Sequence, residues 1–329
     1  MASNTERAAA LPSWVEPQLA TLTHERFSVP EWIYERKLDG ERCLAFCGRD
    51  GVSLKSRSKH EITTTFPEIA AALATQGRGE LVLDGEVVAF DGAQTRFERL
   101  QQRLGLASPP QRLLDEIPVY YYLFDVLYAD GHDTRTLPLT ERKRQLAALV
   151  DFRDPLRFTE DRAGNGVPFW DQACKDGWEG LVAKRADAPY LAGRTKNWLK
   201  FKCENGQEFV IGGYTDPQRS RVGFGALLLG YYDADGDLVY AGKVGTGFDT
   251  RTLQSLHDVL AGLERDSAPF GKGKLPSPRG VHWVTPRLVG QVGFSEWTDD
   301  GELRHPRFQG LRRDKSAKEV IREEPQDDV

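Results

Sequence analysis

The stretch WIYERKLDGERCLAF, residues 32–46, decides how this chain is interpreted. Residues 32–36 alternate in polarity, which predicts a strand, and the apolar run 43–46 predicts a second strand. Asp39-Gly40 is a two-residue turn sequence, so we expect a hairpin with Lys37 at its rim. A lysine held there can act as a nucleophile if its pKa is lowered. For so short a motif, a solvated surface lysine is the alternative.

The composition is that of a soluble globular protein with room for two domains. The chain has 329 residues, of which 40% are hydrophobic and 28% charged. No apolar stretch approaches the roughly 20 residues that span a bilayer, so we expect no membrane association. The N-terminus lacks the basic start and apolar run of a signal peptide, so we expect a cytoplasmic protein.

The four cysteines fit that expectation. Cys43 and Cys47 point to one face of a strand, and Cys174 and Cys203 stand alone in the sequence. There is no C-x-x-C pair and no histidine at ligand spacing, which argues against a structural zinc site. We expect buried, reduced thiols at all four positions.

The formal net charge of −5 argues weakly against a polyanionic partner, but the charge is unevenly distributed. Residues 304–318 contain six basic side chains and one acid, Asp314. Arg194, Lys196, Lys200 and Lys202 form a second cluster without an acid. These basic segments would suit a nucleic acid.

The pattern of elements predicts an α+β chain of two domains. Residues 1–205 alternate predicted strands with amphipathic helices. Residues 206–320 consist of short β runs with one helix between them, which is typical of an oligonucleotide-binding (OB) barrel. We expect a flexible linker at 203–207, where Glu204-Asn205-Gly206 has turn chemistry, and an acidic, solvated tail at 321–329.

Asp84-Gly85-Glu86 interrupts a predicted apolar strand with two acids that share one face. A glycine within a strand often marks a close approach of another backbone. The functional interpretation is a divalent-cation site, since carboxylate oxygens are the ligands of such ions. The alternative is an edge strand protected by charges.

Three further motifs carry candidate site residues. Phe124 ends a strongly β-prone run and is either a core residue or a surface on which a planar base stacks. Glu179 begins a predicted strand after a helix. Lys200 and Lys202 share one face of a strand, where they would bind phosphates and lower the pKa of a nearby lysine.

In this order, these motifs resemble those of the covalent nucleotidyltransferases, and most of all the ATP-dependent DNA ligases. The matching segments are Lys37–Arg42, Ser56-Arg57, Asp84–Glu86, Phe124-Asp125, Glu179–Lys184, Trp198–Lys202 and Arg304–Lys315. The second domain resembles bacterial ligases of the end-joining type, here without fused polymerase or nuclease modules. After Ser56-Arg57 the family commonly continues with Asn or Asn-Gly, whereas this chain has Ser58-Lys59.

The resemblance implies an adenylation (nucleotidyltransferase, ATP-grasp-like) domain of antiparallel sheets with flanking helices, followed by the OB barrel. It implies that Lys37 takes AMP from ATP, with Lys200, Lys202 and Asp314 as further catalytic residues. Glu86 and Glu179 would bind Mg²⁺ or Mn²⁺. The ATP-binding residues it implies are Glu35, Lys37, Arg42, Arg57, Glu86, Phe124, Lys200, Lys202, Arg312 and Lys315.

The expected substrate is nicked double-stranded DNA, sealed through a lysyl-AMP and an adenylated DNA strand. We expect a monomer in the bacterial cytosol or nucleoid, with a Ku-type end-binding protein or repair proteins as candidate partners. An RNA ligase or a capping-type nucleotidyltransferase is one alternative. A non-enzymatic OB protein that binds nucleic acid is the other. A P-loop enzyme is set aside because no G-x-x-x-x-G-K-[ST] motif occurs.

Overall fold

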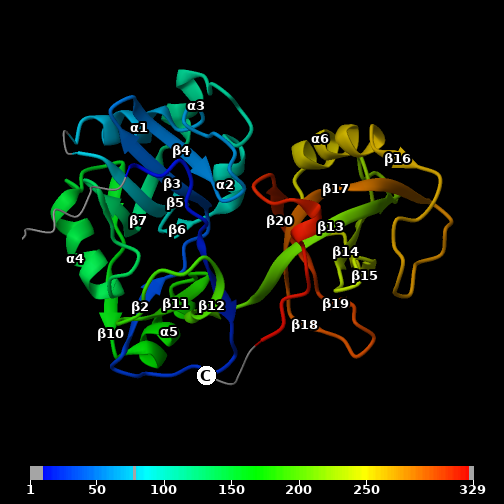
Figure 1. The fold of residues 1–329 in the computed structure, drawn as a ribbon. Helices are drawn as coiled ribbons and strands as arrows, with labels where there is room; N and C mark the ends of the chain where they lie inside the picture. The colour runs from blue at the N-terminus through cyan, green and yellow to red at the C-terminus, as the bar shows by residue number, and fades with distance from the viewer. Residues whose placement is uncertain (1–9, 77–78, 326–329) are drawn as a thin grey trace, which may run out of the picture. The chain divides into compact units, whose positions relative to one another are not determined.

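The computed structural model describes residues 10–76 and 79–325, which form two compact units. The first unit runs to Cys203 and the second spans Glu204–Glu324. In Figure 1 the first unit is coloured from blue to green and the second from green to red. Within the described ranges, none of the helices has both the length and the apolar character that crossing a membrane requires.

The first unit contains two sheets. The seven-stranded sheet has the order β4-β3-β5-β7-β8, with β6 beside β5 and β9 beside β7. Its pairings are antiparallel except for β7 with β9. Its strands are β3 (Glu41–Gly48), β4 (Gly51–Ser56), β5 (Leu81–Asp91), β6 (Gln94–Thr95), β7 (Val119–Ala129), β8 (His132–Asp133) and β9 (Leu156–Phe158).

Helices cover one face of this sheet (Figure 1). They are α1 (Pro67–Ala74), α2 (Phe97–Gln101), α3 (Gln111–Glu116) and α4 (Leu139–Leu149). Ile69 of α1, Phe97 of α2 and Leu146 of α4 enter the same core as Leu83 of β5. The opposite face carries a second core in which Phe124 of β7 meets Trp198 from the other sheet. Polar groups between the two sheets therefore form the region where a site can be built.

The five-stranded sheet has the order β1-β12-β11-β2-β10. Helix α5 (Gly166–Lys175) packs on one of its faces, with Phe169 and Ala173 against Tyr34 and Phe201. The parallel strand β1 beside β12 has no counterpart in the sequence prediction. The strands are β1 (Gln18–Leu22), β2 (Trp32–Arg36), β10 (Asp161–Ala163), β11 (Gly180–Arg185) and β12 (Gly193–Lys202).

The expected hairpin at Asp39-Gly40 is wrong. Both strands exist where predicted, but β2 belongs to the five-stranded sheet and β3 to the seven-stranded sheet. The segment between them crosses from one sheet to the other. Asp39 accepts a hydrogen bond from the Phe97 N–H at 3.1 Å, which ties the crossing to α2. A Cβ at Gly40 would lie 2.2 Å from the Val87 carbonyl oxygen, so glycine is needed for close passage over β5.

The interpretation of residues 84–86 as a protected edge is also wrong. Strand β5 pairs with β3 on one side and with β7 on the other, so it lies inside the sheet. The close backbone approach expected at Gly85 is present, since a Cβ there would lie 2.5 Å from the Tyr122 carbonyl oxygen. Asp84 and Glu86 share the face that looks toward the five-stranded sheet, opposite the helices.

Two of the four cysteines are not reduced, contrary to expectation. Cys174 and Cys203 form a disulfide, whereas Cys43 and Cys47 are buried free thiols as predicted. The antiparallel pairing of β11 with β12 brings Lys202 opposite Gly180, which follows the end of α5 closely. The end of β12 therefore returns to α5, and tertiary structure joins two cysteines that are 29 residues apart.

The second unit is a curled antiparallel sheet of the OB type. Its order is β15-β14-β13-β17-β16, with β20 paired to β17. Helix α6 (Thr250–Ala261), the one helix predicted in this domain, packs on it through Leu253, Leu256 and Leu260. The strands are β13 (Asn205–Thr215), β14 (Leu227–Tyr232), β15 (Leu238–Val244), β16 (Glu264–Arg265), β17 (Val281–Phe294), β18 (Glu296–Trp297), β19 (Leu303–Arg304) and β20 (Arg307–Arg312), followed by the short helix η1 (Ala317–Glu319). The predicted α+β class with a C-terminal barrel is confirmed.

The acidic tail expected at 321–329 is only partly described, because residues 326–329 lie outside the described ranges. Residues 321–323 are hydrogen-bonded to the second unit, although Ile321 remains 51% exposed. Gln207 donates its side-chain N–H to the Ile321 carbonyl oxygen at 3.3 Å and accepts the Glu323 N–H at 3.0 Å. These residues are therefore part of the fold of that unit.

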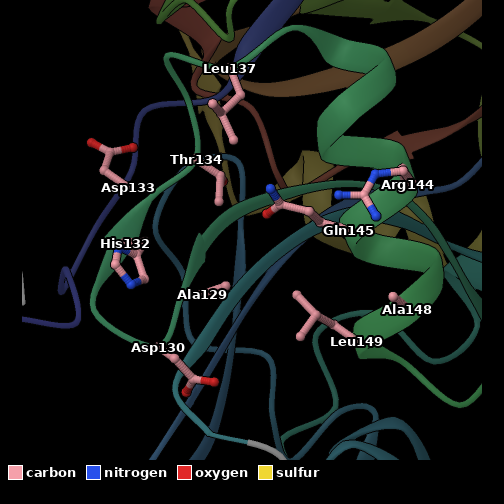
Figure 2. A pocket seen from close by; sticks show the side chains of 10 residues that line it. All are labelled: Ala129, Asp130, His132, Asp133, Thr134, Leu137, Arg144, Gln145, Ala148 and Leu149. Carbon is pink, nitrogen blue, oxygen red and sulfur yellow. The ribbon is translucent and has the colours of Figure 1, made fainter.

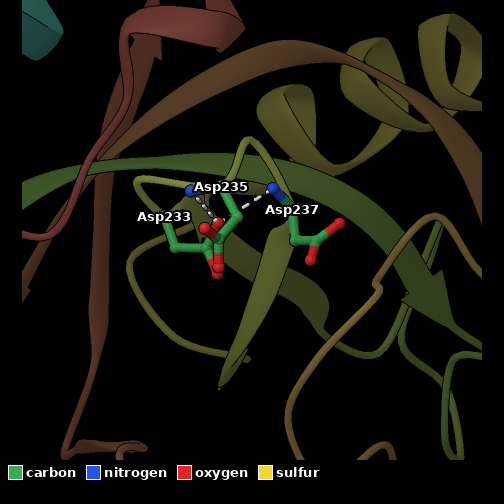
Figure 3. A group of neighbouring side chains, drawn as sticks. All are labelled: Asp233, Asp235 and Asp237. Carbon is green, nitrogen blue, oxygen red and sulfur yellow. Dashed lines mark hydrogen bonds between the residues drawn. The ribbon is translucent and has the colours of Figure 1, made fainter.

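The turn between β14 and β15 holds three carboxylates, those of Asp233, Asp235 and Asp237 (Figure 3). The ammonium group of Lys272 lies 2.6, 3.0 and 3.2 Å from them. It takes the position that a metal ion would need, and it ties the turn to the segment before β17. We therefore describe this group as a charge cluster that supports the local fold.

Candidate active site

Lys37 lies at the start of the crossing between the two sheets. Its N–H donates to the Gly180 carbonyl oxygen at 2.9 Å, so its backbone continues the pairing of β2 with β11. Its Nζ lies 2.6 Å from Oε2 of Glu179, in the turn between α5 and β11. The side chains are 21% and 28% exposed, respectively. Lys37 is thus a partly buried amine, accessible from the space between the sheets.

The expected lowering of the Lys37 pKa is wrong. Burial alone would lower this pKa, but the Glu179 carboxylate outweighs it, and Asp39 and Glu86 add to the effect. The pKa of Lys37 is therefore raised above its ordinary value. Sequence reasoning assigned Glu179 to a metal and missed that its carboxylate pairs with Lys37.

Strand register brings the predicted lysines to the same face as Lys37. Glu35 of β2 pairs with Val182 of β11, which pairs with Lys200 of β12. One step further along, Lys37 bonds to Gly180, which pairs with Lys202. The opposite face of these strands is apolar and packs on α5. The sheet therefore presents two parallel rows of charged side chains toward the seven-stranded sheet.

Glu35 is buried in an ion cluster that the sequence did not reveal. Its Oε1 accepts a hydrogen bond from Lys143 Nζ at 2.6 Å, and its Oε2 lies 2.5 Å from Lys184 Nζ. Lys143 comes from α4 and lies 3.2 Å from Asp161. Burial would raise the pKa of Glu35, but the two lysines outweigh it and keep this pKa lowered. Both carboxylate oxygens of Glu35 hold lysines, so any adenine contact has to share them.

Lys143 and Lys184 are functional candidates that sequence reasoning missed. Lys184 ends the motif that begins at Glu179, and its position within a short buried strand could have signalled burial. Lys143 gave no signal, because a lysine in an amphipathic helix is expected to face solvent. Its side chain is 6% exposed.

Arg42 and Phe124 come from the seven-stranded sheet. Arg42 forms a bidentate ion pair with the buried Asp84, both contacts measuring 2.6 Å. Asp84 also accepts a hydrogen bond from the Tyr190 hydroxyl at 2.7 Å. The Arg42 guanidinium lies 4.6 Å from the centre of the Phe124 ring, which meets Trp198 edge to face. Phe124 thus closes the space between the sheets, next to Lys184 Nζ at 4.1 Å from its ring centre.

Of the two acids in the 84–86 motif, Glu86 is the one suited to a metal. Asp84 is fully buried and its oxygens are used by Arg42 and Tyr190. Glu86 is half-buried, pairs across the strand with Arg42 and influences the pKa of Lys37. The structure therefore places Glu86 and Glu179 around the same amine. Oxygen donors of this kind suit Mg²⁺ or Mn²⁺.

The half-buried Arg57 begins a turn that departs from the family pattern. Lys59 donates its N–H to the Ser56 carbonyl oxygen at 3.0 Å. Ser56 in turn donates its N–H to the His60 carbonyl oxygen at 2.9 Å. Lys59 closes the turn with φ of 68°, in the left-handed region. Asn and Gly adopt this region more readily than Lys.

Replacing Lys59 with Asn should stabilise the protein by about 0.5–1 kcal/mol, because Asn tolerates the left-handed backbone better. Urea unfolding at neutral pH measures the change. Lys55→Asn on the neighbouring strand, where the backbone is extended, is the control and should not stabilise. An unchanged or lower midpoint for Lys59→Asn would mean that the turn is not strained.

The three remaining candidates lie in the second unit. Arg312 forms a bidentate pair with Asp314 at 2.8 and 2.7 Å, and Lys315 lies 3.2 Å from Glu208. Asp314 is buried, and Arg312 ends β20. They lie within that unit, while the other candidates lie in the first unit, with Arg57 in the turn after β4.

A pocket in the first unit, between the β7–β8 turn and α4, contains none of the candidate residues (Figure 2). Asp130 comes from the turn, His132 from β8, and Arg144 and Gln145 from the helix. Arg144 is bound to Glu141 and largely exposed. The pocket has no group of converging charges comparable to that around Lys37.

Comparison with known sequences defines the family. Residues 17–202 match the ATP dependent DNA ligase domain and residues 220–315 the ATP dependent DNA ligase C terminal region. The chain is 39% identical over 323 residues to the multifunctional non-homologous end joining protein LigD of Pseudomonas aeruginosa, an alignment covering 96% of this chain and 37% of that protein. It is 32% identical over 308 residues to a DNA ligase of Thermococcus fumicolans, covering 88% and 53%. The chain belongs to the ATP-dependent DNA ligase family.

Solved structures agree with this assignment. A mycobacterial DNA ligase D complexed with ATP and MES is similar with a TM-score of 0.68 and 35% identity, covering 94% of this chain and 98% of that one. The ligase domain of LigD from M. tuberculosis gives 0.50 and 34%, with the same coverage. The chain spans about two fifths or less of the LigD proteins that it matches. It is similar to the ligase part of those proteins.

Proposed function

We propose that this protein seals nicks in double-stranded DNA, using ATP and a covalent AMP on Lys37. The observation that carries the proposal is the position of Lys37. Its amine is partly buried, contacts Glu179 at 2.6 Å and shares a sheet face with Lys200 and Lys202. This arrangement provides a nucleophile, carboxylates for a metal and cations for phosphates in one place.

In the first step, Lys37 Nζ attacks the α-phosphate of ATP. A nitrogen–phosphorus bond forms, the bond to the β-phosphate oxygen breaks, and pyrophosphate leaves. Lys200 and Lys202 offset the charge of the phosphates. A metal ion held by Glu86 and Glu179 would supply further charge neutralisation. Arg42, Arg57 and Phe124 form the remainder of the proposed nucleotide site, with Glu35 at its buried end.

AMP then passes from Lys37 to the 5′-phosphate at a nick, and the 3′-hydroxyl displaces it to close the strand. Arg312, Asp314 and Lys315 of the second unit are proposed to act on the nucleotide during the first step and to withdraw before DNA binds. The linker near Cys203 would allow that movement. End joining is the proposed pathway, with a Ku-type protein as a candidate partner, and the cytoplasm is the proposed compartment.

Incubation with α-labelled ATP and Mg²⁺ should label the protein covalently, and a nicked DNA duplex should then be sealed with loss of the label. Labelling by GTP instead would favour a capping-type enzyme. Sealing of nicked RNA but not DNA would favour an RNA ligase. DNA binding without labelling by any nucleotide would support the non-enzymatic alternative and refute the proposal.

The rate of adduct formation should rise with pH because the raised pKa of Lys37 keeps the amine protonated near neutrality. Below the pKa, the free-amine fraction grows about tenfold per pH unit. Glu179→Gln removes the charge that raises this pKa. The rate of adduct formation by this variant should therefore begin to rise at a lower pH than in the wild type, even if its maximum rate falls. Single-turnover labelling between pH 6 and 10 measures the pH profiles of the wild type and of the variant.

The exposed Glu25 offers the control, since Glu25→Gln should leave the pH profile of the wild type unchanged. If Glu179→Gln and the wild type rise over the same pH range, Glu179 does not control the protonation of Lys37.

A further inference from the structure

The disulfide between Cys174 and Cys203 lies where the chain leaves the first unit. Cys174 belongs to the last turn of α5, and Cys203 is the final residue of that unit. Strand β13 of the second unit begins at Asn205, so only Glu204 separates the bridged cysteine from it. The flexible linker expected at 203–207 is therefore wrong for residues 205–207, which pair with β17. The disulfide therefore fixes the starting point of the linker.

The two bridged cysteines differ from the other two in accessibility. Cys174 and Cys203 are half-exposed, whereas Cys43 and Cys47 are buried. Burial raises the pKa of the Cys47 thiol to about 12 and that of Cys43 well above its ordinary value. Thiols that stay protonated and buried react poorly with disulfides or oxidants. We therefore expect Cys174 and Cys203, and not Cys43 or Cys47, to react with external thiols or oxidants.

The linker anchor is also connected to the partner of Lys37. The Cys203 N–H donates to the Glu179 carbonyl oxygen at 3.0 Å, and the Glu179 carboxylate contacts Lys37 at 2.6 Å. The loop closed by the disulfide runs from Cys174 to Cys203 and contains Glu179, Lys200 and Lys202. The seven-stranded sheet lies outside this loop. The bridge thus constrains one half of the proposed nucleotide site together with the linker.

We propose that Cys174 and Cys203 form a thiol–disulfide exchange site, and that its redox state sets how firmly the linker and the Glu179 turn are held against α5. Its reaction partner is a dithiol reductant. A thiolate of the reductant attacks one protein sulfur, a mixed disulfide forms, and the other protein sulfur leaves as a thiolate. The second thiol of the reductant resolves the mixed disulfide. Two electrons and two protons pass to the protein, and the reductant becomes a disulfide.

Opening the bridge should loosen the five-stranded sheet near the linker. Loop-closure entropy for 29 residues predicts a fall in the melting temperature of the first unit of roughly 10 °C on reduction. A Glu-specific protease should cut more rapidly at the exposed Glu204, because the linker is then free to leave α5.

The first test is to purify the protein without reductant and alkylate it under native conditions before and after treatment with dithiothreitol. Peptide mapping should find Cys174 and Cys203 alkylated only after reduction, while Cys43 and Cys47 stay unmodified until the protein is denatured. Melting and proteolysis at Glu204 are measured on the same samples. Alkylation of both cysteines before reduction would overturn the proposal.

The second test uses the double variant Cys174→Ser/Cys203→Ser, with Cys47→Ala as the matched control. The double variant should melt like the reduced wild type and should not respond to dithiothreitol, whereas Cys47→Ala should respond as the wild type does. If the double variant does not fold, comparison of the two redox states of the wild type remains decisive. If reduction of the disulfide changes neither the melting temperature nor the proteolysis at Glu204, the disulfide does not hold the linker against α5.

The catalytic readout separates this inference from the proposed function. Labelling by ATP and sealing of a pre-adenylated nick are timed in both redox states, and we expect reduction to change their ratio. An unchanged ratio would show that the bridge does not reach the site. If no adduct forms in either redox state, the proposed function fails. Alkylation, melting and proteolysis still decide whether the disulfide holds the linker and the Glu179 turn against α5.

Discussion

Replacing Lys37 with arginine should abolish the covalent AMP adduct. Arginine keeps the positive charge beside Glu179, so the fold should be preserved, but it stays protonated and offers no lone pair. Sealing of an ordinary nick should fall by roughly 10³-fold or more, as when other covalent nucleophiles are removed. Denaturing gels of protein incubated with labelled ATP measure the adduct, and a nicked duplex measures sealing.

The same variant should still seal a nick that already carries AMP, because Lys37 has completed its part before that step. The exposed Lys175 provides the control, and Lys175→Arg should label and seal like the wild type. Labelling of Lys37→Arg at a rate near that of the wild type would show that another residue is the nucleophile. Loss of both reactions together with a lower melting temperature would indicate that the fold had been damaged.

Replacing Arg142 with methionine should cost about 3–5 kcal/mol of stability, the second large effect we expect. Arg142 of α4 forms a bidentate pair with Asp125 at 2.7 and 2.8 Å, and neither side chain is exposed. It also donates to the carbonyl oxygens of Leu137 and Ala188. The variant leaves a buried carboxylate without its counter-charge, and urea unfolding measures the loss.

The double variant Asp125→Leu/Arg142→Met should recover much of that loss, since both charges are then removed together. Arg144→Met on the same helix is the matched control. Arg144 is 70% exposed, and its contact with Glu141 should contribute at most about 1 kcal/mol. Equal destabilisation by Arg142→Met and Arg144→Met would contradict the importance assigned to the buried pair. Because Asp125 follows Phe124, the single variant should also disturb the proposed nucleotide site.

Much of the local structure could be predicted from the sequence. Alternation of polar and apolar residues placed β2 at its observed bounds. The same periodicity placed Lys200 and Lys202 on one face. Their proximity to Lys37 follows from strand register, which the motif order implied only through the resemblance.

The pairing of segments distant in sequence could not be predicted. Asp39-Gly40 permits a tight turn, but nothing local shows whether the flanking strands bond to each other or to separate sheets. The disulfide between Cys174 and Cys203 forms because the end of β12 lies next to the end of α5. The positions of the two cysteines in the sequence do not predict this contact. Lys143 was missed for a related reason. Its burial depends on the position of Glu35, 108 residues away, and not on its own helix.

The crossing between the sheets also restricts where residues can be inserted into this chain. The chain is fixed at Lys37 by the bond to Gly180 and at Asp39 by the bond from Phe97, with β3 beginning two residues later. One inserted residue adds about 3.3–3.6 Å of extended chain. A hairpin could absorb it in its loop, but here it would move either the amine away from Glu179 or β3 out of register with β5. Loop insertions are thus expected to be tolerated elsewhere on the surface and excluded between residues 37 and 41.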